Sequence, residues 1–205
     1  MKIEREIRIL DGLGIEERKD NRPPTLKGYA AVFDTETDIG GFFREKIARG
    51  AFADAISKAS ADVHALFNHD DNVVLGRMKS ATLRLSEDDH GLAVEIDTPD
   101  TQDARDLIAK IKRGDIDQMS FAFRVRPGGS DKWDYSQDTP LRTIEKIGEL
   151  FDVSVVTRGA YPTTEIGLRS LNDDRDAQRR QHNFRAASTR IRLKMNLDLK
   201  IWRTA

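Results

Sequence analysis

The chain has 205 residues, of which 38% are hydrophobic and 34% are charged, and its formal net charge is −1. This length suffices for one domain with a sizeable core, and there is no run of about 18 apolar residues that would cross a membrane. Because the chain has no cysteine, disulfides, thiolate metal sites and a cysteine nucleophile are excluded, and a reducing cytosol is the expected environment.

The first part of the chain predicts short strands, loops and one short helix. Residues 1–10, MKIEREIRIL, lack the apolar region of a signal peptide, so we expect none. The polar stretch 15–24 ends in two prolines and predicts a loop. Residues 26–33 are rich in β-formers and predict a strand, residues 34–41 predict a turn, and residues 49–59 predict a short helix.

Four apolar runs with a period near two come next, and each is separated from the following run by Asn, Asp or Gly. This pattern is typical of consecutive antiparallel strands, so we predict a β-meander. The four runs are residues 62–68, 72–77, 81–87 and 91–98.

Residues 100–114 form the clearest helical pattern in the chain. Asp100 can cap the start, and Gly114 can end the helix after a basic last turn. One face of this helix is apolar at i, i+3, i+4 and i+7, as expected for packing against a core. The residues on that face are Ala104, Leu107, Ile108 and Ile111.

The rest of the body predicts strands around one polar loop. Residues 115–127 predict a strand, residues 128–140 a polar loop that carries Trp133, and residues 141–147 and 149–157 two further strands. Many strands with two inserted helices predict an α+β domain built on an antiparallel sheet or barrel.

The C-terminal part differs in charge and in pattern. From residue 171 onward the chain holds nine Lys or Arg and four Asp, so this tail carries +5 and the rest of the chain −6. We therefore divide the chain into a body, residues 1–170, and a basic tail, residues 171–205. Apolar and polar residues alternate over 191–201, which is strand periodicity. Docking on a sheet edge, delivery of the body to a partner and an ordinary solvated terminus all fit this tail.

Ser120 lies in the predicted strand 115–127, whose two faces differ in composition. Met119, Phe121 and Phe123 share one face with Val125, whereas Ser120 shares the other with small neighbours such as Ala122. A small polar strip suits a substrate backbone beside a nucleophile. An ordinary strand serine explains the same pattern.

His69 follows an apolar strand and precedes two aspartates. Alternation places it on the face of that strand that carries Val63, Ala65 and Phe67. A histidine at a strand end beside a loop suits a general base. A histidine that bonds to Asp70 or to the acid after it explains the position equally well. The four histidines have no clustered spacing, so we expect no zinc site and no metal.

Asp152 interrupts an otherwise apolar strand and therefore needs a partner, because burying an unpaired carboxylate is costly. That partner is either an arginine or an imidazole N–H, and Glu149 is the reserve candidate. A Ser/His/acid set is thus available from three strands. There is no G-x-S-x-G, Walker A or dinucleotide-binding glycine pattern. The residues alone leave a serine hydrolase as one hypothesis.

Several spaced blocks, in order over residues 25 to 170, resemble the prohead maturation protease family of tailed bacteriophages. The blocks are GYAAVFD, GGFFREKIARGAF, LFNHDDNVVLGR, LRLSEDDHGLAVEIDTPDTQDARDLIAKIKRGDIDQMSFAFRV and RTIEKIGELFDVSVVTRGAYPTT. The resemblance implies a serine endopeptidase whose fold is similar to that of the herpesvirus assembly proteases, a mainly antiparallel barrel-like sheet with surrounding helices.

The resemblance also implies roles for individual residues. Ser120 would be the nucleophile and His69 the base, with Asp152 as the third member and Glu149 in reserve. The chain departs from the family after its last strand, where Gly159 opens a Gly-Ala-Tyr-Pro sequence in place of a proline-led one. Arg158 and Gly159 are therefore candidates for a loop near the oxyanion site.

The partners implied by the resemblance are the major capsid protein with its scaffolding segment and the chain itself, through autoproteolysis and as a possible homo-oligomer. A segment removed by this self-cleavage is a further interpretation of the basic tail, residues 171–205. Neither a cofactor, a nucleic acid nor a membrane is required. The expected location is the host cytoplasm, inside the procapsid. The alternative is a catalytically inactive assembly or scaffolding protein on the same fold.

Overall fold

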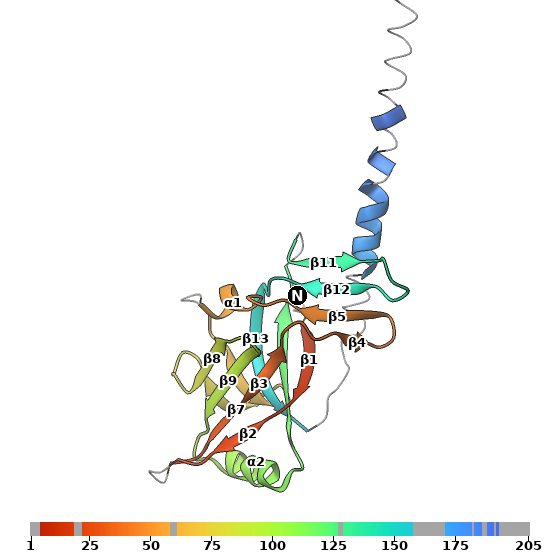
Figure 1. Cartoon of the computed structure of the whole chain (residues 1–205). Coiled ribbons are helices and arrows are strands. Elements are labelled where there is room, and N and C mark those ends of the chain that lie inside the picture. Colours follow the sequence, from red (N-terminus) through yellow and green to blue (C-terminus); the bar gives the residue numbers. More distant parts are fainter. Residues whose placement is uncertain are drawn as a thin grey trace, which may run out of the picture. The chain divides into compact units, whose positions relative to one another are not determined.

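A computed structural model describes residues 5–18, 22–57, 61–126, 129–157, 171–181, 183–185, 188–190 and 192. The chain divides into two compact units, residues 1–166 and 167–205. All described strands belong to the first unit (Figure 1). The described residues of the second unit are helical. The alternating stretch 191–201 lies outside the described residues except for Arg192, and a functional border between body and tail stays a prediction.

The strands of the first unit form three sheets. A five-stranded sheet runs in the order β1 (Glu6–Asp11), β10 (Gln118–Arg124), β13 (Glu149–Val156), β6 (His64–Phe67) and β7 (Asp70–Arg77). A four-stranded sheet runs in the order β11 (Asp131–Asp134), β12 (Leu141–Ile144), β5 (Phe43–Ile47) and β4 (Thr37–Ile39). Another runs in the order β2 (Gly14–Glu16), β3 (Thr25–Val32), β9 (Gly91–Asp97) and β8 (Leu83–Glu87).

The described helices and strands are compatible with an α+β fold, and most of the strand pairs are antiparallel. Only the pairs β13–β6 and β12–β5 are parallel among the described strands. In the described part of the chain the strands make three sheets and no closed barrel, whereas the expectation is a barrel-like sheet. The predicted β-meander is also wrong. β6 and β7 join β13, whereas β8 and β9 join β3, because the mostly buried strand β13 accepts β6 as a parallel neighbour.

The two helices lie close to where their patterns predict them. Helix α1 spans Ala53–Ser57 and helix α2 spans Gln102–Arg113. Helix α2 is capped by Thr101 rather than by Asp100, because the Thr101 side chain accepts a hydrogen bond from the backbone N–H of residue 104. It ends at Gly114, which has the left-handed φ of +83° that glycine adopts at little cost. Its predicted apolar face is buried.

Two short strands occupy regions whose composition predicts a turn and a loop. They are β4, inside residues 34–41, and β11, inside residues 128–140. Trp133 of β11 packs edge-on against Phe43 of β5 with ring centroids 5.1 Å apart, and the guanidinium of Arg142 lies 5.8 Å from its ring. These tertiary contacts stabilise strand structure in a segment that is locally polar.

Strand β10 has the two faces expected from its sequence. Phe121 stacks on Phe123 with ring centroids 5.0 Å apart. It also meets Phe52, the residue before helix α1, edge-on with centroids 5.4 Å apart. Together with Met119 these rings are fully buried in the core. The aromatic face therefore anchors β10, and the opposite face of the strand is left to carry Ser120.

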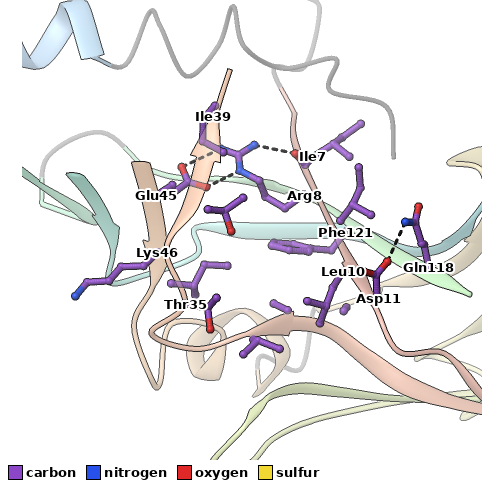
Figure 2. Close-up of a pocket in the computed structure, with 16 residues that line it drawn as sticks. Ile7, Arg8, Leu10, Asp11, Thr35, Ile39, Glu45, Lys46, Gln118 and Phe121 are labelled. Atoms are coloured by element: carbon purple, nitrogen blue, oxygen red, sulfur yellow. Dashed lines mark hydrogen bonds and ion pairs between the residues drawn. The ribbon is translucent and has the colours of Figure 1, made fainter. Parts of the chain in front are cut away.

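A buried charge cluster joins β1 to β5, β11 and β12. Arg142 is only 1% exposed, and its guanidinium lies 2.6 Å from Glu6, 3.0 Å from Glu45 and 2.7 Å from Asp131. Arg8 donates to Glu45 at 2.8 Å, as Figure 2 shows. We call these five residues the Arg142 cluster. Burial alone would raise the pKa of the Glu45 carboxyl, but the charges of Arg8 and Arg142 outweigh it and hold that pKa below its ordinary value.

Within the described residues, no helix combines the length and the apolar character needed to span a bilayer.

Candidate active site

Ser120 lies in the middle of β10, between β1 and β13. Its register partners are Ile9 on β1 and Ser154 on β13. One row further along, the partner of Ala122 on β13 is Asp152. Because paired residues of neighbouring strands point to the same side of a sheet, Ser120, Asp152 and Ser154 share the face opposite the aromatic core. The Ser120 residue is fully buried.

His69 reaches that face from a tight turn, not from a strand. Strand β6 ends at Phe67 and β7 begins at Asp70, and these two residues pair, so Asn68 and His69 form a two-residue hairpin loop. Their φ angles are +53° and +59°, the combination found in a type I′ turn. Alternation along β6 therefore does not fix the direction of His69, and the expectation that it shares a strand face with Phe67 is wrong.

Asn68 fixes this turn to the end of β13. Its backbone N–H donates to the carbonyl of Val155 at 2.9 Å, and its side-chain oxygen accepts the backbone N–H of Thr157 at 2.9 Å. A left-handed φ suits Asn better than most residues. At this turn Asn68 tolerates the left-handed conformation, and the turn directs the side chain of His69 toward Ser120.

The three side chains form a continuous hydrogen-bonded chain. His69 Nε2 lies 2.8 Å from Ser120 Oγ, and His69 Nδ1 lies 2.6 Å from Asp152 Oδ1. The carboxylate of Asp152 can only accept, so Nδ1 carries the proton and Nε2 is left to accept one from the hydroxyl. The His69 side chain is 19% exposed, whereas that of Asp152 is buried. This geometry allows a base to remove the serine proton.

The Ser120 hydroxyl has a second acceptor within reach. Its Oγ lies 2.8 Å from the backbone carbonyl oxygen of Arg8 on β1. A hydroxyl has one proton, so a bond to Arg8 competes with the bond to His69. Together with the burial of Ser120, this contact leaves the serine hydroxyl covered.

A described cavity lies beside β1 and β10. It has a volume of about 360 Å³ and is lined by residues that include Leu10, Ala31, Ile47 and Phe121 (Figure 2). Ser120 is not among the described lining residues, because it points away from Phe121. His69 and Asp152 are not among its described lining residues either.

A comparison with protein families bears directly on this arrangement. The profile of the caudovirus prohead serine protease family matches residues 13–177. The chain belongs to this family. No curated protein and no solved structure gives a significant match. Family membership agrees with the resemblance seen in the sequence, and the likeness to herpesvirus assembly proteases stays a prediction.

Of the remaining predicted site residues of this prohead protease family member, the structure describes only Glu149. Glu149 is exposed at the start of β13 and pairs with Arg124 across the strands. In the described structure it makes no contact with His69. Arg158 and Gly159 lie outside the described residues. Among the residues that are described, no group of three or more His, Cys, Asp or Glu side chains could hold a metal ion.

Three contributors to the site were missed by sequence reasoning. They are the Asn68 anchor, the Arg8 carbonyl and the Ser154 hydroxyl. Ser154 has a visible signal, because it follows Asp152 at i+2 and so shares its strand face. The other two depend on the pairing of β6 and β1 with distant strands, which no local pattern indicates.

Proposed function

We propose that the chain is a serine endopeptidase in which Ser120 is the nucleophile, His69 the general base and Asp152 the group that orients the imidazole. The observation that carries this proposal is the unbroken hydrogen-bonded chain from Ser120 Oγ through both nitrogens of His69 to Asp152 Oδ1. Membership of a prohead serine protease family supports it.

The geometry supports an acyl-enzyme mechanism. As Ser120 Oγ attacks the carbonyl carbon of a peptide bond, His69 Nε2 takes the hydroxyl proton, and a tetrahedral intermediate forms. The imidazolium then gives that proton to the leaving amine, and the C–N bond breaks. Water attacks the resulting ester with His69 again as base, which releases the acid and restores the Ser120 hydroxyl. Asp152 stabilises the imidazolium at each stage.

The proposed substrates are the major capsid protein, with its scaffolding segment, and the chain itself. The family description supports a role in the prohead. We therefore propose that the enzyme acts inside the procapsid in the host cytoplasm, that copies of it associate there, and that it needs no cofactor, nucleic acid or membrane.

A second candidate function is an assembly protein without catalysis. The observation that favours it is the burial of Ser120, whose hydroxyl also lies against the Arg8 carbonyl. A protease must open this arrangement to admit a peptide, whereas an assembly protein need not. The short contacts of His69 to Ser120 and Asp152 favour the protease.

Co-expression with the cognate capsid protein distinguishes the two functions. We expect the wild-type chain to shorten the capsid protein at one defined site and the Ser120→Ala variant to leave it whole, as measured by intact mass spectrometry of assembled shells. A fluorophosphonate should label Ser120 in the same shells, identified by peptide mapping. Shells that form with uncut capsid protein and an unlabelled wild-type chain would establish the assembly function instead.

The Asn68 turn gives a further expected result. Asn68→Gly keeps a positive φ at no steric cost but removes the carboxamide that accepts the Thr157 N–H. Because a base displaced by 1 Å can lose about 100-fold in rate, we expect kcat for a peptide substrate to fall about 10-fold in this variant. Asn72→Gly, at an exposed position in β7, is the control and should retain wild-type kcat. Equal rates for the two variants would contradict the anchoring role.

A further inference from the structure

Ser154 stands out as a buried polar side chain that the mechanism does not use. It lies on β13 and is fully buried, and it is the register partner of Ser120. Its hydroxyl donates to Asp152 Oδ1 at 2.7 Å, and its Oγ lies 3.2 Å from His69 Nδ1. Ser154 therefore contacts both the proposed base, His69, and the acid that orients it, Asp152.

The two oxygens of the Asp152 carboxylate differ in their partners. Oδ1 accepts from both His69 Nδ1 and the Ser154 hydroxyl. Oδ2 is buried and accepts no hydrogen bond in the described structure, with a guanidinium nitrogen of Arg5 at 4.0 Å as its described ion-pair partner. The orientation of the carboxylate is thus set at Oδ1, where Ser154 supplies one of the two donors.

We propose that Ser154 is a positioning residue for the Asp152–His69 pair: its hydroxyl holds Asp152 Oδ1 against His69 Nδ1, and this keeps His69 Nε2 directed at Ser120. The inference rests on the proposed protease function. With its proton donated to Asp152, the Ser154 oxygen also faces the His69 N–H, so the imidazole ring is guided by two acceptors on one strand. The described hydrogen-bond partners of the Ser154 side chain are Asp152 and His69, so its contacts place it with this pair.

The test compares Ser154→Ala with Ser154→Thr, which keeps the hydroxyl on a strand-forming residue. We expect Ser154→Ala to lower kcat for a peptide substrate about 10- to 100-fold with KM unchanged, because the loss lies in base alignment and not in substrate binding. Ser154→Thr should recover most of that loss.

The chain offers a matched control in Thr25. Its hydroxyl donates to Asp97 Oδ1 at 2.9 Å from a buried strand position in another sheet. Thr25→Val removes the same kind of bond far from His69, so it should lower the unfolding midpoint as Ser154→Ala does while leaving kcat at the wild-type value. A fall in kcat that follows thermal stability in all variants, with no recovery in Ser154→Thr, would overturn the positioning role.

A measurement independent of hydrolysis separates this inference from the proposed function. In the Ser120→Ala full-length chain, the proton on His69 Nδ1 should give a downfield proton NMR resonance, because it is bonded to a carboxylate. Adding Ser154→Ala should shift or broaden it, and adding Thr25→Val should not. If the wild-type chain fails to hydrolyse peptides but the resonance responds in this way, the protease function fails and the positioning stands. An unchanged resonance together with unchanged kcat would overturn the positioning itself.

Discussion

The Ser120→Ala variant, the His69→Ala variant and the double variant are all expected to lose kcat for peptide hydrolysis by the same factor, roughly 10⁶-fold. The two side chains share one proton transfer, since His69 Nε2 lies 2.8 Å from Ser120 Oγ. Once one of them is missing the other has nothing to act on. The effects of the single variants should therefore not multiply in the double variant.

The same kinetic series separates the two candidate acids. Asp152→Asn keeps the shape of the side chain but offers His69 a poorer partner, so we expect kcat to fall by about 10⁴-fold. Glu149→Gln, at an exposed position paired with Arg124, should retain the wild-type rate. Steady-state kinetics with a peptide from the capsid cleavage site would measure all five variants. Multiplying losses for Ser120 and His69, or a large loss in Glu149→Gln, would contradict the assignment.

Replacing Arg142 with methionine is expected to lower the free energy of unfolding by about 3–5 kcal/mol. The side chain is 1% exposed and forms ion pairs with Glu6, Glu45 and Asp131. Methionine fills much of the volume but leaves these buried carboxylates with too few cations. The cost thus arises from uncompensated buried charge and not from lost packing.

Chemical denaturation of this variant has a natural control in Arg84→Met. Arg84 also pairs with two acids, Glu95 and Asp97, but it is largely exposed, so its removal should cost no more than about 1 kcal/mol. The pKa of Glu45 is lowered in the folded state, so its contribution to stability is present above its unfolded pKa and is lost as the pH falls through the folded value. Similar losses in the two variants would show that the Arg142 cluster is not effectively buried.

The sequence predicts those features that depend on local periodicity. Helix α2 shows its apolar face and its Gly114 end because side-chain positions repeat along a helix. The two faces of β10 follow from alternation alone, and this is why Ser120 was expected on the side away from the phenylalanines. Asp152 was expected to have a partner because its strand is apolar, and it lies against His69.

The features that escaped prediction depend on pairing between distant strands. The split of the expected meander follows from the parallel pairing of β6 with β13, which no residue pattern in either strand specifies. The Arg142 cluster gathers side chains from residues 6 to 142, and each of them alone is typical of a solvated surface. The direction of His69 depends on two backbone angles in a turn, whereas sequence alternation applies only within a strand.

The turn that presents His69 has an evolutionary consequence. Asn-Gly is the most favourable pair for a two-residue hairpin with both φ angles positive, and a side chain in the left-handed region costs about 1 kcal/mol relative to glycine. In a lineage without selection for cleavage, replacement of His69 by glycine would raise the folding stability, because residues 68–69 would then be Asn-Gly. Histidine at this position is therefore a residue that folding stability alone would not select.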